Sequence, residues 1–293
     1  MATPEPPPPA VEEAVATGVP DDANDLRGYH FKRLMGKTPT VVLLGSLTLV
    51  AFIAGGIAVD PLIGLLAAAA VFLLGVLIVL VIADNKSASD FFEVYAEKRG
   101  LSLVHGRGRL PQATPLLRKG DDRYAERTLS GPFADGVEGI LALYTYEEES
   151  TDSKGNRQTD YYRYTVALVP VPESAELVPE LYCQRKFGLR ALEGLEDVFR
   201  RSKQRVEFES EALAGKYEIF AGKGQDANRL RQLFAPTFIV WLTESAPKKF
   251  AFELVDSTLC CYVNGHKKNA EELEEVSAAA AVVAKRLREE SLE

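Results

Sequence analysis

Two apolar stretches, one directly after the other, constrain this chain more than any other feature. The first covers residues 40–59 and has 20 residues, the second covers residues 62–83 and has 22, and only Asp60 and Pro61 separate them. A helix of about 20 apolar residues, rising ~1.5 Å per residue, crosses the ~30 Å hydrocarbon core of a bilayer. We therefore predict a transmembrane helical hairpin, with Pro61 in the first turn of its second helix.

This hairpin divides the chain into three predicted parts. Residues 1–38 form a disordered, Pro-rich, acidic tail and a basic juxtamembrane segment, residues 39–84 form the transmembrane hairpin, and residues 85–293 form a cytoplasmic α+β domain. The first 26 residues hold six acidic residues and no Lys or Arg, and they lack apolar periodicity, which is typical of disorder. A docking motif is the alternative for the proline run at 4–9. Because no cleavage site follows the first apolar stretch, we expect a retained anchor.

Charge predicts the orientation of the hairpin. Arg27, Lys32, Arg33 and Lys37 precede the first apolar stretch, whereas the hairpin tip carries only Asp60. By the positive-inside rule, the protein is a multi-pass protein of the cell membrane with both termini in the cytoplasm. Contact with anionic lipid headgroups is a second interpretation of the basic cluster. The net charge of −8 gives no basic footprint, so we expect no nucleic-acid partner.

Small residues recur at four-residue spacing inside the hairpin, where Ala51 precedes Gly55 and Gly64 precedes Ala68. Such spacing lets two helices approach closely. Packing within the hairpin and self-association through the membrane both remain open at this point. Asp60 is the one ionisable residue between residues 40 and 83. Because intramembrane charges mark transport paths, we do not expect a transporter or channel built from this hairpin alone.

The remaining residues predict an α+β domain with a mainly antiparallel sheet. We expect a helix at 87–100, with Ser89 as a cap and Gly100 as its end, and then an irregular segment at 101–125. Residues 137–149 and 160–172 alternate apolar and polar side chains, which predicts a β-hairpin with a long polar loop. Further predicted elements are strands at 180–186, 205–210 and 216–222, a hairpin at 248–265 that turns near Asp256 and Ser257, and helices at 188–203 and after Asp226, Pro236 and Asn269.

The strand alternation also predicts which side chains form the core. One face of the hairpin carries Ile140, Ala142, Tyr144 and Tyr146 from the first strand and Tyr162, Tyr164, Val166 and Leu168 from the second. We expect Tyr164, Val166 and Leu168 to be buried together, with Phe208, Ile219 and Trp241 elsewhere in the core.

The last predicted helix carries an apolar seam with spacings of three and four residues, formed by Leu273, Val276, Ala280, Val283 and Leu287. Such spacing is that of a coiled coil, although it lasts only about two heptads. Two interpretations remain open for this seam. The helix packs against the sheet of its own domain, or it pairs with a second copy of the chain.

Several short strings resemble a class of bacterial membrane-anchored proteins that carry a domain of unknown function. The resemblance covers roughly residues 125–265 and implies one or two membrane spans followed by an α+β domain. It implies no activity and no catalytic residue. The strings are residues 144–146, 162–169, 181–182, 206–210, 217–220 and 234–236.

The side chains that most often carry chemistry are sparse or badly spaced. His30 lies beside the membrane, and His105 and His266 are predicted in loops, without the spacing of a zinc site. Three cysteines do not make a disulfide framework. Cys260 and Cys261 are adjacent in a predicted strand, so we expect one in the core and one exposed.

Carboxylates are plentiful, and we expect them to face solvent. Glu147, Glu148 and Glu149 lie at a predicted strand end, and Glu207 and Glu209 share the face of another strand. A hydrolase based on two carboxylates would need burial that composition does not indicate. We therefore predict no catalytic residue, no cofactor-binding residue and no metal ligand, and we expect no cofactor.

An anchor, a well-formed domain and no catalytic motif favour a membrane-tethered cytoplasmic module for binding or assembly, and not an enzyme. Its expected partners are the lipid bilayer and either another protein or a second copy of the chain. One alternative is a membrane-bound hydrolase or transferase that uses acidic residues. The other alternative is an accessory subunit of a transport complex.

Overall fold

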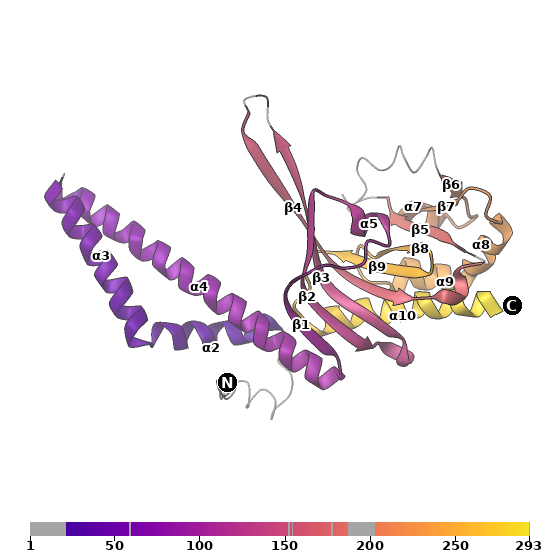
Figure 1. Cartoon of the computed structure of the whole chain (residues 1–293), viewed down its shortest axis with the longest axis horizontal. Helices are drawn as coiled ribbons and strands as arrows, with labels where there is room; N and C mark the ends of the chain where they lie inside the picture. The colour runs from indigo at the N-terminus through magenta and orange to yellow at the C-terminus, as the bar shows by residue number, and fades with distance from the viewer. Residues whose placement is uncertain are drawn as a thin grey trace. The chain divides into compact units, whose positions relative to one another are not determined.

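The computed structural model describes residues 22–58, 60–151, 153, 155–176, 178–186 and 203–292 (Figure 1). The chain forms two compact units. Unit 1 is Met1–Lys98 with Lys268–Ala270, and unit 2 is Arg99–Lys267 with Glu271–Glu293. The predicted tail up to residue 21 and nearly all of the predicted helix at 188–203 lie outside the described residues.

Unit 1 contains two long apolar helices, α3 (Thr38–Ala58) and α4 (Pro61–Arg99). Both are long and apolar enough to cross a membrane. Pro61 opens α4 as predicted, and the carboxylate of Asp60 accepts a hydrogen bond from the backbone N–H of Leu62 at 2.8 Å. The tip therefore caps the second helix.

The two helices touch through glycine. A Cβ atom added to Gly64 would lie 2.6 Å from the backbone oxygen of Phe52 and 2.6 Å from the backbone nitrogen of Gly56. A Cβ added to Gly55 would lie 2.8 Å from the Cα atom of Gly64. Only residues without a side chain allow this approach, so the small residues at this end of the hairpin serve packing inside it.

A helix that we did not predict, α2 (Ala23–Met35), precedes the hairpin. Asp22 caps it by accepting a hydrogen bond from the N–H of Asn24 at 2.8 Å. Ala23, Leu26 and His30 recur at helical spacing and are buried. The prediction of disorder up to residue 26 is therefore wrong for its last residues, because a cap and a short apolar stripe order this segment.

Helix α4 is one continuous helix, whereas we predicted a separate helix that begins at Ser89. No Gly or Pro occurs from Val76 to Arg99, so nothing in this stretch interrupts the backbone hydrogen bonds. Gly100, with φ of +64°, ends the helix where the sequence predicted. Residues that follow the apolar stretch therefore extend the same helix.

Unit 2 is built on a nine-stranded sheet with the order β1-β2-β3-β4-β9-β8-β5-β7-β6. Each pair of neighbours in this order is antiparallel. The strands are β1 (Ser102–Gly108), β2 (Asp122–Pro132), β3 (Glu138–Thr151), β4 (Arg157–Pro170), β5 (Glu180–Arg185), β6 (Lys203–Val206), β7 (Tyr217–Gly222), β8 (Ala251–Val255) and β9 (Thr258–Asn264).

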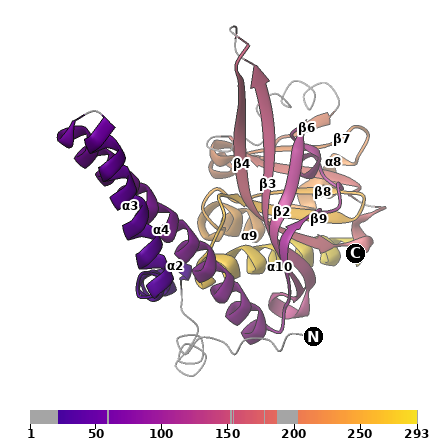
Figure 2. The ribbon, with the colours of Figure 1, turned by 60° about the vertical axis from the view of Figure 1, so that its left-hand side comes forward.

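Short helices and one long helix accompany the sheet. The long helix runs beside the sheet (Figures 1 and 2), and the short helix α5 lies against the sheet (Figure 1). The helical elements are α5 (Pro115–Arg118), η1 (Ala134–Gly136), η2 (Pro172–Ser174), α7 (Glu211–Lys216), α8 (Ala227–Leu233), α9 (Pro236–Val240), the π-helical turn η4 (Trp241–Ser245) and the long α10 (Ala270–Leu292).

Both predicted hairpins are confirmed. β3 pairs with β4 from Ile140 opposite Leu168 to Thr151 opposite Arg157. β8 and β9 turn at Asp256 and Ser257, whose φ angles of +45° and +67° are those of a two-residue hairpin turn. The distal part of the β3–β4 hairpin extends beyond the neighbouring strands (Figure 2).

Two predicted segments are wrong. Residues 102–108 form the edge strand β1 and not an irregular segment; its largely exposed side chains need no apolar alternation. The strand predicted at 205–210 is β6, which ends at Val206, and helix α7 follows it. Ser210 caps α7 by accepting from the N–H of Leu213 at 3.3 Å, a local contact that competes with strand formation.

The predicted core is largely confirmed. Tyr164, Val166 and Leu168 join a buried cluster that also contains Tyr144, Tyr146 and Tyr262. Ile219 is buried, whereas Phe208 and Trp241 are only partly buried, because both lie in the peripheral α7–η4 region and not in the sheet. All five side chains of the α10 seam are buried, with exposures of 0 to 2%. Packing of α10 within the chain is therefore the interpretation that the structure supports.

Candidate functional site

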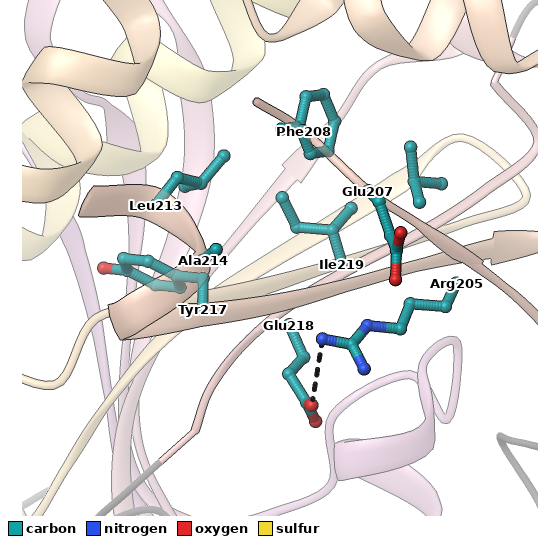
Figure 3. Close-up of a pocket in the computed structure, with 9 residues that line it drawn as sticks. Arg205, Glu207, Phe208, Leu213, Ala214, Tyr217, Glu218 and Ile219 are labelled. Carbon is teal, nitrogen blue, oxygen red and sulfur yellow. Dashed lines mark ion pairs between the residues drawn. The ribbon is translucent and has the colours of Figure 1, made fainter. Parts of the chain in front are cut away.

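A groove at the β6 end of the sheet is the candidate site. Its inner part is a cavity of about 230 Å³ between β6, β7 and α7. Phe208, Leu213 and Ile219 surround this cavity with apolar side chains (Figure 3). At its border, Arg205 Nη2 lies 3.6 Å from Glu218 Oε1, an ion pair on neighbouring strands.

A wider hollow of about 890 Å³ adjoins the first one and shares Glu207 and Phe208 with it. Pro236, Ile239 and Val240 of α9 give it an apolar wall, and Val240 is 51% exposed. We call the residues that line the two hollows the β6 groove. They are Arg205, Val206, Glu207, Phe208, Glu209, Ser210, Leu213, Ala214, Tyr217, Glu218, Ile219, Arg231, Pro236, Ile239 and Val240.

Local sequence explains how the groove forms. The cap at Ser210 starts α7, and Pro236 starts α9, so the chain turns away from the sheet on both sides of the groove. Phe208 contacts Phe234 with ring centroids 4.8 Å apart, and Phe234 contacts Phe238 at 5.5 Å. This row of rings holds the groove to the interior of unit 2.

The carboxylates of the groove do not resemble a catalytic pair. Glu207 and Glu209 were predicted on one strand face, but both follow the end of β6 and are exposed. Glu218 lies in β7 and pairs with Arg205. Exposed or paired carboxylates provide charge at a binding surface, whereas a general acid at neutral pH needs burial.

An unusual carboxylate of unit 2 lies elsewhere, and it was not among the predicted site residues. Glu253 is completely buried in β8, and its Oε2 atom accepts a hydrogen bond from the N–H of Leu116 at 3.1 Å. Burial raises the pKa of Glu253 to about 7, and this hydrogen bond opposes the rise. The hydroxyls of Thr114 and Tyr262 also lower the pKa, without reaching good hydrogen-bond geometry. A single acid inside the apolar run Ala251–Val255 was the available indication.

A small polar cavity of about 110 Å³ lies beside α5, and Glu253 is not among the residues that line it. The lining includes Arg109, Asp121, Arg123 and Tyr144. Glu253 therefore holds α5 against the sheet, and the geometry does not place it at a substrate cavity.

The three histidines occupy different elements. His30 Nε2 is 2.9 Å from Asp90 Oδ2 in unit 1. His105 is in strand β1, not in a loop as predicted. His266 Nε2 lies 3.1 Å from the backbone oxygen of Tyr144, and Thr145 beside it is completely buried. These contacts are structural. Among the described residues, no group of three or more His, Cys, Asp or Glu side chains could hold a metal ion.

The cysteines Cys183, Cys260 and Cys261 are free thiols, and all are completely buried. Burial raises the pKa of each thiol well above its ordinary value. The prediction that one of the adjacent pair is exposed is wrong, because both faces of the central strand β9 are covered. Glu147, Glu148 and Glu149 lie in β3, with Glu149 exposed as expected and the other two partly buried.

An apolar helical hairpin joined to an antiparallel α+β unit with a surface groove is the class of structure that these features define. No family model matches the sequence, and no curated protein matches it. Among solved structures, the chain is similar to the crystal structure of the mycobacterial trehalose monomycolate transport factor A, TtfA. The sequence identity is 12% and the TM-score is 0.41, and the match covers 67% of this chain and 92% of that chain.

Proposed function

We propose that the chain is a multi-pass membrane protein whose unit 2 is a cytoplasmic, non-enzymatic module that binds a protein partner. One observation about exposed apolar side chains supports the proposed membrane anchor. Of the 24 large apolar side chains that are exposed in the described part of the chain, nine lie on α3 and eleven on α4. Soluble monomers rarely leave an apolar surface of this extent in water, whereas a bilayer covers it.

The orientation follows from charge. Arg27, Lys32, Arg33 and Lys37 lie before α3, and Lys86 lies beyond the apolar part of α4, whereas the tip carries Asp60. Positive residues stay in the cytoplasm, so both termini belong there. Reporter fusions at residue 37 and at the C-terminus test this topology. Activity of an extracytoplasmic reporter at either position would overturn it.

The β6 groove supports binding rather than catalysis. It combines an apolar wall at Ile239 and Val240 with exposed carboxylates at Glu207 and Glu209. An apolar centre with a charged rim is the usual anatomy of a protein interface. We therefore expect a partner that inserts an apolar side chain and offers basic residues to the rim.

The test compares full-length variants purified from cross-linked membranes. Val240→Glu places a charge in the groove, and Val282→Glu makes the same change at a 38% exposed position of α10. Proteins that accompany the wild type and Val282→Glu but are lost from Val240→Glu identify the partner. If both variants keep the same partners as the wild type, the groove is not the binding site.

A further inference from the structure

Helix α2 is fixed to α4 by its buried side. His30 is 4% exposed, and its Nε2 atom lies 2.9 Å from Asp90 Oδ2 on α4. The hydroxyl of Ser87, also on α4, donates a hydrogen bond to the backbone oxygen of Ala23. These contacts hold α2 beside the segment of α4 that follows its apolar stretch.

Positive charge gathers around this contact. Burial lowers the pKa of His30, Asp90 opposes this shift, and the charges of Lys86 and Arg33 add to it. Helices α2 and α4 therefore both place basic side chains near His30. From Arg27 to Lys37 the chain contains four basic residues and no acidic residue. The exposed bases of this surface, which we call the α2 basic surface, are Arg27, Lys32, Arg33, Lys37 and Lys86.

The same helix carries an apolar stripe beside its bases. Phe31 and Met35 are four residues apart, and Arg27 lies four residues before Phe31, so the base and the two apolar side chains lie along one side of α2. Phe31 and Met35 are only partly buried, and Lys32 beside them is exposed. Bases that flank partly exposed apolar side chains are typical of a helix in the headgroup region, where the apolar parts enter the bilayer and the charges face phosphate.

Only Gly36 and Lys37 separate the end of α2 from the start of α3 at Thr38. If α3 spans the bilayer, as the proposed function holds, the C-terminal end of α2 lies at the level of the headgroups. We infer that the α2 basic surface binds anionic phospholipid headgroups of the cytoplasmic leaflet. Its charge and its continuity with the span identify lipid, and not a soluble anion, as the occupant.

The test measures lipid retention by native mass spectrometry on the full-length protein in detergent. Phosphatidylglycerol and phosphatidylcholine with the same acyl chains are added in turn. The wild type retains the anionic lipid in preference to the zwitterionic lipid. In Arg27→Gln/Lys32→Gln/Arg33→Gln this preference falls by about tenfold or more. The conservative triple Arg27→Lys/Lys32→Arg/Arg33→Lys keeps it.

A matched control removes three exposed bases of unit 2, Arg229→Gln/Lys248→Gln/Lys249→Gln, and keeps the wild-type preference. Equal retention of both lipids by the wild type, an unchanged neutral triple, or an equal loss in the control would each overturn the inference. Loss of the lipid preference in the presence of inorganic phosphate would also overturn it, because it indicates a general anion site.

Carbonate extraction of membranes separates this inference from the proposed function. If the wild-type protein is extracted, the membrane anchor itself fails. If it stays in the membrane fraction and shows no preference for anionic lipid, only the lipid site fails. The melting temperature of the neutral triple, followed by helical circular dichroism, must equal that of the wild type, because a fall assigns the bases to folding and overturns the inference.

Discussion

The backbone N–H of Leu116, in α5, donates a hydrogen bond to the carboxylate of Glu253, in β8, across 3.1 Å. Both residues are completely buried. This bond ties a four-residue helix to the middle of the sheet and leaves a titratable group in the core. The protonation of Glu253 is therefore linked to the stability of unit 2.

The first prediction concerns pH. The pKa of Glu253 rises from 4.5 to about 7 on folding, so between these values the folded state binds more protons than the unfolded state. The contribution of Glu253 to the free energy of unfolding is therefore greatest below pH 4.5, and it is lost as the pH rises through 7. The full contribution is roughly 3 kcal/mol. Glu253→Gln should remove this slope and unfold at a higher temperature than the wild type at pH 8.

The measurement uses Trp241, the one tryptophan of the chain, whose fluorescence reports on unit 2 in full-length protein held in detergent. Melting temperatures are compared between pH 5 and 8. Glu207→Gln, at an exposed carboxylate that follows β6, is the control and should follow the wild-type slope. Parallel curves for the wild type and Glu253→Gln would show that the buried carboxylate does not titrate in this range.

The second prediction tests the core of the β3–β4 hairpin. Val166 is completely buried, so Val166→Asp places an unpaired charge in the core and should lower the melting temperature by on the order of 10 °C or prevent folding. Val104 lies in the edge strand β1 and is 55% exposed. Val104→Asp should change the melting temperature by only a few degrees. Similar melting temperatures for the two variants would contradict the register described for β4.

The third prediction separates the two interpretations of α10 by means of adjacent valines. Val283 is 1% exposed and Val282 is 38% exposed. Val283→Asp should destabilise unit 2 strongly, and Val282→Asp should leave both stability and mass in solution unchanged. Melting and light scattering of the detergent-solubilised protein provide the measurements. A Val283→Asp protein that melts like the wild type but loses a dimer would instead show that the seam is an interface between copies.

The fourth prediction concerns the hairpin. Gly64→Ala brings a Cβ atom into the backbone of α3 and should push the helices apart, at a cost of roughly 1–3 kcal/mol. Gly45→Ala has open space around it and is the control. Hydrogen exchange of the amides near Gly56 should quicken only in the first variant. Equal exchange in both variants would mean that the close contact is absent from the protein in solution.

Sequence periodicity predicted the structure correctly wherever one local rule determined it. Twenty apolar residues determine a long helix, Pro61 and Gly100 determine where α4 begins and ends, and alternation around Val166 determines which face of β4 is buried. In these places the backbone preference and the burial of side chains act in the same direction. The prediction therefore needed no knowledge of distant residues.

Tertiary structure decided the places where distant segments supply the reason. β1 is a strand because β2 pairs with it, although its own side chains are mostly exposed. Phe208, expected in the core, lines a groove because Ser210 starts α7 and turns the chain away from the sheet. The sequence identified Glu207 and Glu209 as carboxylates that face solvent. It did not show that α9 would place an apolar wall beside them.

The limit of prediction from local sequence is clearest for three buried residues, Glu253, Cys260 and Cys261. The sequence by itself determined that Cys260 and Cys261 point to opposite faces of one strand, because side chains alternate along a strand. It could not determine that both faces are covered, since the covering elements come from elsewhere in the chain. Likewise, a Glu in an apolar strand acquires a raised pKa only when the fold brings Leu116 and its neighbours over it and excludes water. Alternation is a local property of the backbone, whereas exclusion of water depends on residues far apart in sequence.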